Sequence, residues 1–268
     1  MIDVSIVIVS YNVRGDLGRC LASLGDHRPK ASHEIVVVDN DSTDGSADEA
    51  RRRSGVRVIE MGANTGYAAA NNVGIRASLG DTLLLLNSDT IVPAGAIDRL
   101  LEHLREHPDV AVIGPRLVDA TGRAELSFGP MLSPLSEWRQ RRLVLGNARG
   151  TSAAVGRVAE MTGRIQWPDW VSGACLLVRR ADAEAVGLLD ERYFMYMEDV
   201  DFCAAIRARG RRILFTPDVE VVHLRGRSAA VAPQATRAAY RRSHLAFYEK
   251  HHPWIAPLIR LYRTIARA

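Results

Sequence analysis

Short apolar runs alternate with helical segments along the first 120 residues, and this alternation constrains the fold more than any other feature. The runs lie at Val4–Ser10 (VSIVIVS), Ile35–Val38, Val56–Ile59 and Thr82–Leu86. Uninterrupted apolar runs of this length are typical of strands buried on both faces of a parallel sheet. Residues at helical spacing lie between them, for example Leu17, Cys20, Leu21 and Leu24. The pattern predicts a Rossmann-like α/β fold, with a mostly parallel central sheet and helices on both faces.

Residues 123–168 interrupt this alternation. They contain scattered Arg, Gly and Pro with Trp138 and Trp167, and show no period. We interpret them as an irregular insert, because long segments of this kind in compact domains are usually functional loops or lids. Regular strands and helices are expected again from Ala174 to Val222. The sequence predicts one domain over residues 1–228, with halves at 1–122 and 123–228, and a helical tail over 229–268.

Charge is unevenly distributed along the chain. The formal net charge is +4, yet residues 225–268 hold nine Lys or Arg side chains and a single acid, Glu249. A basic end of this kind favours an anionic partner such as phosphate, nucleic acid or an acidic membrane surface. We expect no nucleic-acid partner, because no motif that reads bases is present. Three cysteines without C-x-x-C spacing favour a reducing cytosol over a disulfide framework or a zinc site.

Polar side chains directly follow three of the expected strands. They are Ser10-Tyr11-Asn12, the acidic turn from Asp39 to Gly45, and Asn87-Ser88-Asp89. Ligands of open parallel sheets bind outside the carboxyl ends of the strands, so these groups are expected to converge on one crevice. The sequence therefore places a candidate site at this edge of the sheet.

Other interpretations of the acidic turn fit less well. A phosphatase of the haloacid dehalogenase type requires a later lysine, and only Lys250 follows the turn. A calcium loop fails because its glycine lies one place late and Ala50 stands where a bidentate Glu is needed. No strand is followed by a P-loop or a G-x-G-x-x-G phosphate loop.

Six sequence blocks, in order from Val4 to Ser228, resemble family 2 glycosyltransferases, above all the rhamnosyltransferase-like branch that builds bacterial surface polysaccharides. The blocks are VSIVIVSYN, EIVVVDNDSTDGS, NTGYAAANNVGI, LLLLNSDT, VSGACLLVRR and MYMEDVDFCAAIRARG. The resemblance implies a GT-A fold, a UDP- or dTDP-linked sugar donor and inversion at the anomeric carbon. It also implies that residues 1–122 bind the nucleotide sugar and residues 123–228 bind the acceptor.

The resemblance assigns the first two strand ends to the donor. Tyr11, flanked by Ser10 and Asn12, is expected to stack on the base, and Asp39 to bond to the nucleoside. The alternative is that Asp39 and Asp44 only form turns and cap the following helix. We favour donor binding for Asp39 and the turn for Asp44.

The third block adds Asn64 and Gly66 to the expected donor site. They open a helix whose N-terminal N–H groups are able to receive an anion, although Gly66 also fits a simple turn glycine. Asn71 and Asn72 are interpreted as structural support inside this helix. Asp41 stands where the family commonly has a small residue such as Gly.

Asn87, Ser88 and Asp89 occupy the place of the family's D-x-D metal motif, with Asn87 replacing its first carboxylate. Asp89 is therefore expected to hold Mg²⁺ or Mn²⁺ together with the donor's diphosphate, with Asn87 and Ser88 beside the donor. His223 is a candidate nitrogen ligand that would favour Mn²⁺, or else a hydrogen-bonded surface residue. Arg225 and Arg227 fit either a lid over the diphosphate or a solvated basic tail.

Glu198, Asp199 and Asp201 begin a helix, where acids normally only complement the helix dipole. The family places its catalytic base at the second acid of this Glu-Asp pair, which is Asp199. Beside a helix N-terminus, we expect Asp199 to stay ionised with a low pKa. Glu198 is expected to orient Asp199 or to contact the acceptor, and Gly173 to let the backbone approach the acceptor closely.

The C-terminal tail carries an apolar helical stripe that includes Ile255, Leu258 and Ile259, beside a basic stripe that begins at Arg260. This pattern fits a helix lying on anionic lipid, and equally a helix packed on the domain or on a second subunit in a homodimer. We predict an inverting, metal-dependent glycosyltransferase at the inner, cytoplasmic face of the cell membrane, with a glycan or polyprenyl-diphosphate-linked acceptor. A catalytically silent sugar-binding module and a sugar nucleotidyltransferase are the alternatives.

Overall fold

The computed structural model describes residues 2–224 and 233–265, the side chains of residues 233 and 261–265 excepted. The strands of the main sheet are β1 (Val4–Ser10), β2 (His33–Asp39), β3 (Val56–Glu60), β4 (Thr82–Asn87), β5 (Thr90–Ile91), β6 (Val110–Val118), β9 (Cys175–Arg179) and β10 (Arg212–His223). The helices are α1 (Arg14–Asp26), α2 (Ser46–Arg51), α3 (Tyr67–Ala77), α4 (Ala96–Glu106), α5 (Pro134–Ala148), α6 (Ser152–Thr162), α7 (Arg180–Ala185), α8 (Glu198–Ala208), α10 (Pro233–His251) and α11 (Ala256–Ile265).

The eight-stranded sheet has the order β3-β2-β1-β4-β9-β6-β10-β5. β1 pairs in parallel with β2 and β4, and β10 pairs in parallel with β6, whereas β9 and β5 run antiparallel to their neighbours. The register sets Ser10 beside Asp39 and Val9 beside Asn87. The predicted mostly parallel α/β fold is therefore confirmed, and the three polar strand ends lie along one edge.

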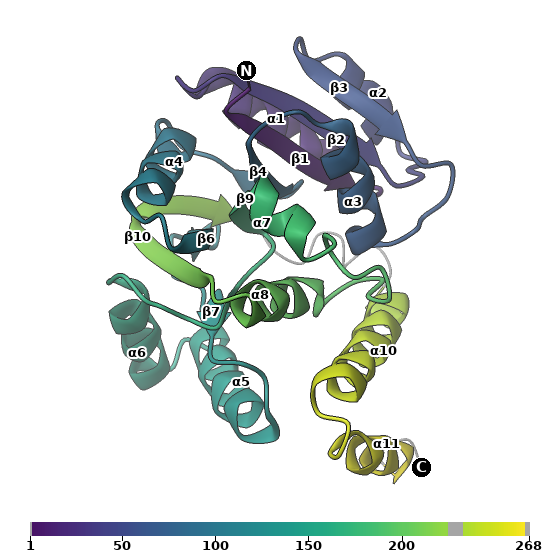
Figure 1. Cartoon of the computed structure of the whole chain (residues 1–268), viewed down its shortest axis with the longest axis vertical. Coiled ribbons are helices and arrows are strands. Elements are labelled where there is room, and N and C mark those ends of the chain that lie inside the picture. Colours follow the sequence, from purple (N-terminus) through teal and green to yellow (C-terminus); the bar gives the residue numbers. More distant parts are fainter. Residues whose placement is uncertain (1, 225–232, 266–268) are drawn as a thin grey trace.

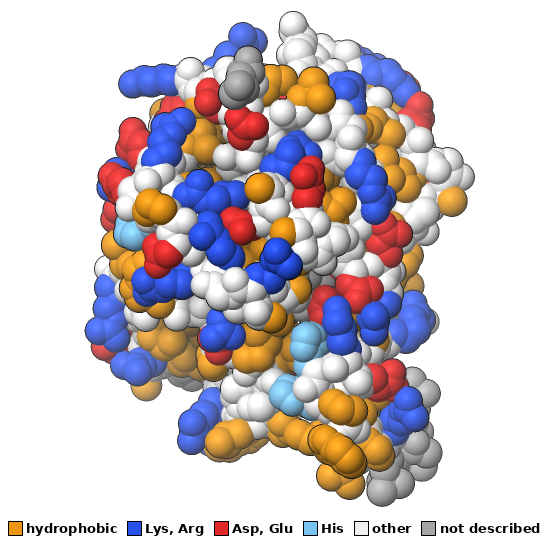
Figure 2. Space-filling view, viewed as in Figure 1, with side chains coloured by type: hydrophobic (Ala, Val, Ile, Leu, Met, Phe, Trp, Pro, Cys, Tyr) orange, Lys and Arg blue, Asp and Glu red, His pale blue; other side chains and the backbone are white. Residues whose placement is uncertain are grey.

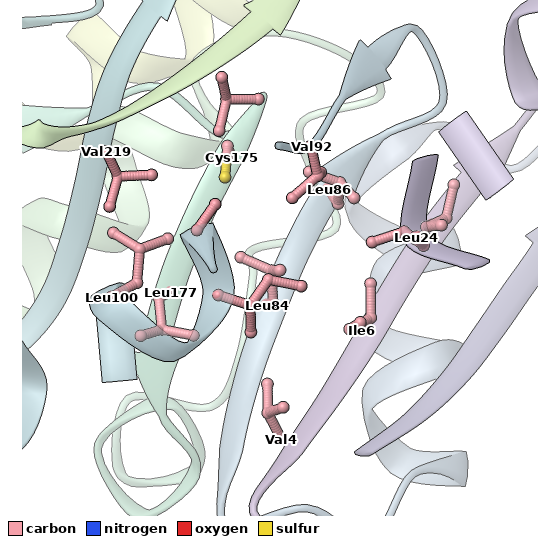
Figure 3. Close-up of a cluster of buried hydrophobic side chains, with 14 of the residues drawn as sticks. Val4, Ile6, Leu24, Leu84, Leu86, Val92, Leu100, Cys175, Leu177 and Val219 are labelled. Atoms are coloured by element: carbon pink, nitrogen blue, oxygen red, sulfur yellow. The ribbon is translucent and has the colours of Figure 1, made fainter. Parts of the chain in front are cut away.

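Helices cover both faces of the sheet (Figure 1). On one face, α1 and α4 bury their apolar stripes against alternate strand residues, among them Ile6, Leu84 and Leu177 (Figure 3). On the other face, α3, α6 and α8 pack on the intervening residues, such as Val7 and Leu85. The strands are apolar on both sides because each side meets a helical layer.

The segment predicted to be irregular contains regular structure. Residues 123–168 hold α5 and α6 as well as β7 (Phe128–Gly129), which pairs with β8 (Trp170–Val171). α5 starts with a capping box between Ser133 and Ser136 and with Pro134 in its first turn. The prediction was wrong because α5 has no continuous apolar stripe: Asn147 is the one buried residue within it.

Late in the chain, β10 is one long strand with a register shift between Thr216 and Glu220. The helical tail predicted over residues 229–268 contains α10 and α11. α10 and α11 extend from the body toward the C-terminus (Figure 1). A cluster that includes Leu132, Tyr193, Phe247 and Tyr248 packs α10 against the starts of α5 and α8. None of the described helices is both long and apolar enough to cross a bilayer.

Candidate active site

Ser10 and Asp39 form a buried polar pair at the ends of β1 and β2. Both are almost fully buried, and Oδ2 of Asp39 accepts a 2.9 Å hydrogen bond from the N–H of Ser42. Asp39 Oδ1 and Ser10 Oγ have no hydrogen-bond partner within the described part of the chain. Buried polar atoms are rarely left unbonded, so these two oxygens fit contacts to a bound ligand.

The loops beside this pair hold one another in place. Asn12 donates its N–H to Ser42 Oγ and accepts the N–H of Thr43 on its side chain. Asp44 accepts N–H groups from Arg14 and Ser46, which is the turn role predicted for it. Tyr11 lies half-buried next to these loops.

Asp41 has φ 71°, in the left-handed region that favours glycine. The small residue common in the family at this place therefore matches the backbone conformation.

The start of α3 is built from side-chain bonds to Asn40. Its amide donates to Asn64 Oδ1 and to the carbonyl of Gly66, and it accepts the N–H of Thr65. Gly66 has φ 90°, and a Cβ there would lie 2.3 Å from the carbonyl oxygen of Phe194. The N–H groups of Gly66 and Tyr67 donate to Asn64 and Phe194. Two N–H groups of the predicted anion site are thus already used, and Gly66 fits its alternative role as a turn glycine.

The two buried asparagines of α3 perform the structural role predicted for them. Asn71 bonds to the carbonyl of Tyr67, and Asn72 exchanges hydrogen bonds with the backbone of Leu189. Asn72 thereby links α3 to the loop that precedes α8.

Asp89, His223 and Glu125 form a buried chain beyond the end of β4, where Asn87 is half-buried and Ser88 is buried. His223 Nε2 lies 3.3 Å from Asp89 Oδ1, and its Nδ1 lies 3.2 Å from Glu125 Oε2. Burial by itself would lower the pKa of His223, but its bonds to the two carboxylates outweigh burial and raise it to about 9. Glu125 was missed from the sequence, because it lies in the segment without a period.

Asp199 and Glu198 begin α8 at the same edge of the sheet. Asp199 accepts a 2.9 Å hydrogen bond from the N–H of Gly173, and Tyr67 donates its hydroxyl to the carbonyl of Gly173. Gly173 therefore contacts the expected base itself. The residue before the pair, Met197, has φ 72°, and Tyr196 has φ 68°. Non-glycine residues in this region store strain, which concentrates at functional sites.

The prediction of a low pKa for Asp199 was wrong. Burial raises the pKa of Asp199, although the N–H groups of Gly173 and Val200 oppose the shift. Burial and the neighbouring charge of Asp199 raise the pKa of Glu198 well above its usual range. Desolvation outweighs the helix N-terminus here, because water stabilises the charged forms less well than it does at the surface.

Asp201, interpreted from the sequence as a simple helix-dipole residue, has a different environment. It is buried and accepts hydrogen bonds from Tyr193, from Lys250 (2.8 Å) and from His251 (2.6 Å). Burial alone would raise its pKa, but the bonds from His251 and Lys250 lower it overall. This network ties α10 to the helix that carries Asp199.

The carboxylates expected to cooperate lie at one edge of the sheet. The N–H of Asn87 donates to the carbonyl of Ala174, next to the Gly173 that bonds to Asp199. Burial raises the pKa of the Tyr67 hydroxyl, and the charges of Glu198, Asp199 and Asp89 add to the shift. Tyr67 thus lies beside Gly173, which bonds to Asp199, and its hydroxyl responds to the charges of both acidic segments. Arg225 and Arg227 lie outside the described residues.

A glycosyl transferase family 2 model matches residues 5–159, more than half of the chain. The chain belongs to this family. The N-acetylglucosaminyl-diphospho-decaprenol L-rhamnosyltransferase of Mycobacterium tuberculosis is 34% identical to this family 2 glycosyltransferase over 270 residues, which cover 94% of this chain and 87% of the relative. The predicted membership and the likeness to rhamnosyltransferases are confirmed.

Solved structures confirm the GT-A-like fold. A mannosyltransferase from Pyrobaculum calidifontis, in complex with GDP-Man and Mn²⁺, superimposes with a TM-score of 0.62 at 20% identity over 96% of this chain and 68% of that one. GalNAc-T7 with UDP, GalNAc and Mn²⁺ also gives a TM-score of 0.62 at 20% identity, over 83% of this chain and 44% of that one. Both neighbours hold Mn²⁺.

The residues of this family 2 glycosyltransferase fit a divalent cation. Histidines that bind metals usually bond through their second ring nitrogen to a carboxylate, which fixes the ring. Glu125 makes this bond to Nδ1 of His223, and Nε2 is directed toward Asp89. One imidazole and one carboxylate suit Mn²⁺, and would leave the remaining positions to diphosphate oxygens and water.

Proposed function

We propose that the protein is an inverting, metal-dependent glycosyltransferase that moves a sugar from a UDP- or dTDP-sugar to a glycan or polyprenyl-diphosphate-linked acceptor. The observation that carries this proposal is the position of Asp199. Its carboxylate is held by Gly173 at the sheet edge where Asp39 ends β2 and Asp89 follows β4. This arrangement supports a base, a nucleoside contact and a diphosphate site at the same edge of the sheet.

On the donor side, Asp39 Oδ1 and Ser10 Oγ bind the nucleoside and Tyr11 stacks on the base. Asn12, Asn64 and Gly66 shape the loops that surround it, since their polar groups already bond to neighbouring loop residues. Asn87 and Ser88 lie between this pocket and Asp89 and contact the donor near its diphosphate.

The reaction is a single displacement. An acceptor hydroxyl attacks the anomeric carbon and forms the new C–O bond, while the bond from that carbon to the diphosphate oxygen breaks. The electron pair leaves with the nucleoside diphosphate, and the hydroxyl proton passes to the carboxylate of Asp199. A base whose pKa is raised toward the working pH is better matched to this transfer than an ordinary Asp. Glu198 orients Asp199 or contacts the acceptor.

Asp89 and His223 would hold Mg²⁺ or Mn²⁺, with Glu125 fixing the imidazole. When bound, the cation supplies positive charge next to the departing diphosphate. The protein's own part is to direct Asp89 and His223 toward the same space and to keep that space largely free of water.

For the sugar, we favour rhamnose, and for the pathway, bacterial surface polysaccharide synthesis at the cytoplasmic face of the membrane. The support is the likeness to the Mycobacterium tuberculosis rhamnosyltransferase, whose name describes a diphospho-decaprenol acceptor. Trp254 and Leu258, at the α10–α11 corner, are 92% and 67% exposed, which fits contact with lipid.

Transfer assays with UDP- and dTDP-sugars test the proposal, using polyprenyl-diphosphate-linked N-acetylglucosamine as acceptor and Mg²⁺ or Mn²⁺ in the buffer. We expect nucleoside diphosphate release and a glycosylated lipid whose anomeric configuration, measured by NMR, is opposite to that of the donor. Asp199→Asn should abolish transfer and leave donor binding intact. The control Asp48→Asn, at an exposed side chain of α2, should leave both transfer and donor binding unchanged.

A retained configuration, or near-normal transfer by Asp199→Asn, would overturn the mechanism. Donor binding without any transfer would identify a silent binding module. Formation of a nucleotide sugar from a sugar phosphate would identify a nucleotidyltransferase.

A further inference from the structure

A long groove leads away from Asp199 between α5 and α10. It has a volume of about 1150 Å³ and is lined from Asp199 and Val200 on α8 to Ile259 on α11. Sites for drug-sized ligands occupy about 300–1,000 Å³. The groove is therefore larger than one acceptor sugar requires, and it begins at the expected base.

Its walls are mostly apolar and aromatic. α5 contributes Trp138 and Val144, β8 contributes Trp170, and α10 contributes Tyr240 and Tyr248. Trp138 is 54% exposed and Tyr240 is 42% exposed, so both present ring surface to the groove rather than to a packed core. A wall of this kind suits a hydrocarbon chain.

Arginines lie along the same walls. Arg141 on α5 and Arg237 and Arg241 on α10 line the groove. Arg141 and Arg237 are exposed and have no carboxylate within ion-pair distance in the described part of the chain. Two acids line the groove, Asp199 and Glu137. The two carboxylate oxygens of Glu137 bond to His244 and Tyr248. The charge of the groove therefore complements an anion, and arginine is suited to phosphate oxygens.

The far end of the groove opens beside the exposed apolar corner. Ile259 lies next in sequence to Leu258, and Figure 2 shows hydrophobic side chains gathered over the end of the molecule formed by α10 and α11. The α10 wall is also fixed relative to α8, because Lys250 and His251 bond to Asp201. The groove is thus lined both by the expected base, Asp199, and by Ile259 beside an apolar surface.

We propose that this groove binds the diphosphate and the first isoprenoid units of a lipid-linked acceptor, with its sugar at Asp199. Arg141, Arg237 and Arg241 bind the diphosphate, and Trp138, Val144 and Tyr240 contact the isoprenoid chain. The proposal rests on the proposed function, and it assigns the lipid part of the acceptor to α5 and α10.

Two acceptors that carry the same sugar distinguish binding in the groove from the transfer reaction itself. One carries the sugar on a polyprenyl diphosphate, and the other is its short alkyl glycoside without phosphate. For the double variant Arg141→Gln with Arg237→Gln, we expect KM for the diphosphate acceptor to rise by about a hundredfold or more, since each lost charged hydrogen bond should weaken binding by at least about tenfold. KM for the glycoside and kcat should stay unchanged.

Arg139→Gln with Arg242→Gln is the control, because both residues are exposed on the same two helices and neither lines the groove. An equal rise in KM in this control pair, or for both acceptors, would show a general charge effect and overturn the proposal. An unchanged KM in the Arg141 and Arg237 variant would overturn it as well.

Binding of farnesyl diphosphate alone, measured by calorimetry, keeps the test independent of turnover. Wild-type protein should bind it, the Arg141 and Arg237 variant should bind it at least tenfold more weakly, and Trp138→Ala should also weaken binding. If the wild type binds it but transfers no sugar, the proposed function fails while the groove assignment stands. If the wild type transfers sugar to the lipid acceptor and the groove variants bind farnesyl diphosphate normally, the groove assignment fails alone.

Discussion

The backbone N–H of Gly173 donates a 2.9 Å hydrogen bond to Oδ2 of Asp199. A Cβ at position 173 would lie 3.3 Å from Cβ of Asp199 and 3.7 Å from Oδ2. The other carboxylate oxygen, Oδ1, accepts the N–H of Val200. With both oxygens bonded and Gly173 this close, the carboxylate is held in one orientation. The position of the expected base therefore depends on the absence of a side chain at residue 173.

We expect Gly173→Ala to lower kcat by roughly tenfold to a hundredfold, since small displacements of a reacting group are costly. The donor KM should stay within about twofold, because Gly173 is distant in sequence from the loops around Asp39 and makes no described bond to them. Steady-state kinetics with varied donor check this. Gly156→Ala, on the exposed face of α6 with no atom within 4 Å of the added carbon, is the control. A variant with unchanged kcat would show that the contact is not needed.

The rate should depend on pH through Asp199. Burial raises its pKa, and the base acts in its deprotonated form. The acidic limb of kcat/KM should therefore lie above the ordinary Asp value of about 3.9, with the rate falling as pH falls through that limb. Because Glu198 also has a raised pKa and lies next to Asp199, the limb reports the pair. In the Glu198→Gln variant, the acidic limb of the kcat/KM profile should reflect one titrating group instead of two. A limb with unaltered position and shape would contradict the interaction between Glu198 and Asp199.

Metal affinity should depend on Glu125 as well as on the two expected ligands. Loss of a carboxylate that orients a ligating histidine typically costs about 10–100-fold in metal affinity. We expect Glu125→Gln to weaken Mn²⁺ binding by this factor, and His223→Ala and Asp89→Asn to weaken it at least as much. Electron paramagnetic resonance of free Mn²⁺ measures the affinity without turnover. His33→Ala, whose ring bonds to the carbonyl of Ala31, should bind as the wild type does.

The Lys250–Asp201 bond should stabilise the fold. We expect Lys250→Met to lower the free energy of unfolding by about 1–3 kcal/mol, because it removes charged hydrogen bonds from the buried carboxylate of Asp201 and from Asp190. Urea denaturation checks this, with Lys30→Met at an exposed turn as control. Equal midpoints for the two variants would show that the pair contributes nothing.

Acid should weaken the same network. The pKa of Asp201 is lowered in the folded protein, so its contribution is present above the unfolded value of about 3.9 and is lost as pH falls through the folded pKa. Asp201→Asn should therefore be less stable than the wild type at neutral pH, and the difference should shrink in acid. A difference that stays constant from pH 7 to pH 3 would contradict the assignment.

Much of the fold of residues 1–122 was predictable, because β1, β2 and β4 are continuous apolar runs, with Asp39 at the end of β2 and Asp89 shortly after β4. Glu125 was not, since it meets His223 through a contact that spans 98 residues and no local pattern marks it. Asp201 was misinterpreted for a related reason: an acid in a first helical turn is usually solvated, and only the packing of α10 brings Lys250 to it. The helix α5 was not predicted, because a helix that forms one wall of an open groove needs no continuous apolar stripe.

The antiparallel strand β9 brings a second set of residues to the catalytic edge from the opposite direction. β1, β2 and β4 reach the catalytic edge with their last residues, whereas β9 begins there, so Gly173 enters from the opposite direction. In the proposed function, the donor lies at strand ends in the first half of the chain, and the acceptor lies beside a segment that arrives from the opposite direction with its own helices. Under this arrangement, residues 123–170 and the C-terminal helices are able to change with the acceptor while the proposed donor site stays the same. The reversed strand would thus separate the choice of acceptor from the choice of donor.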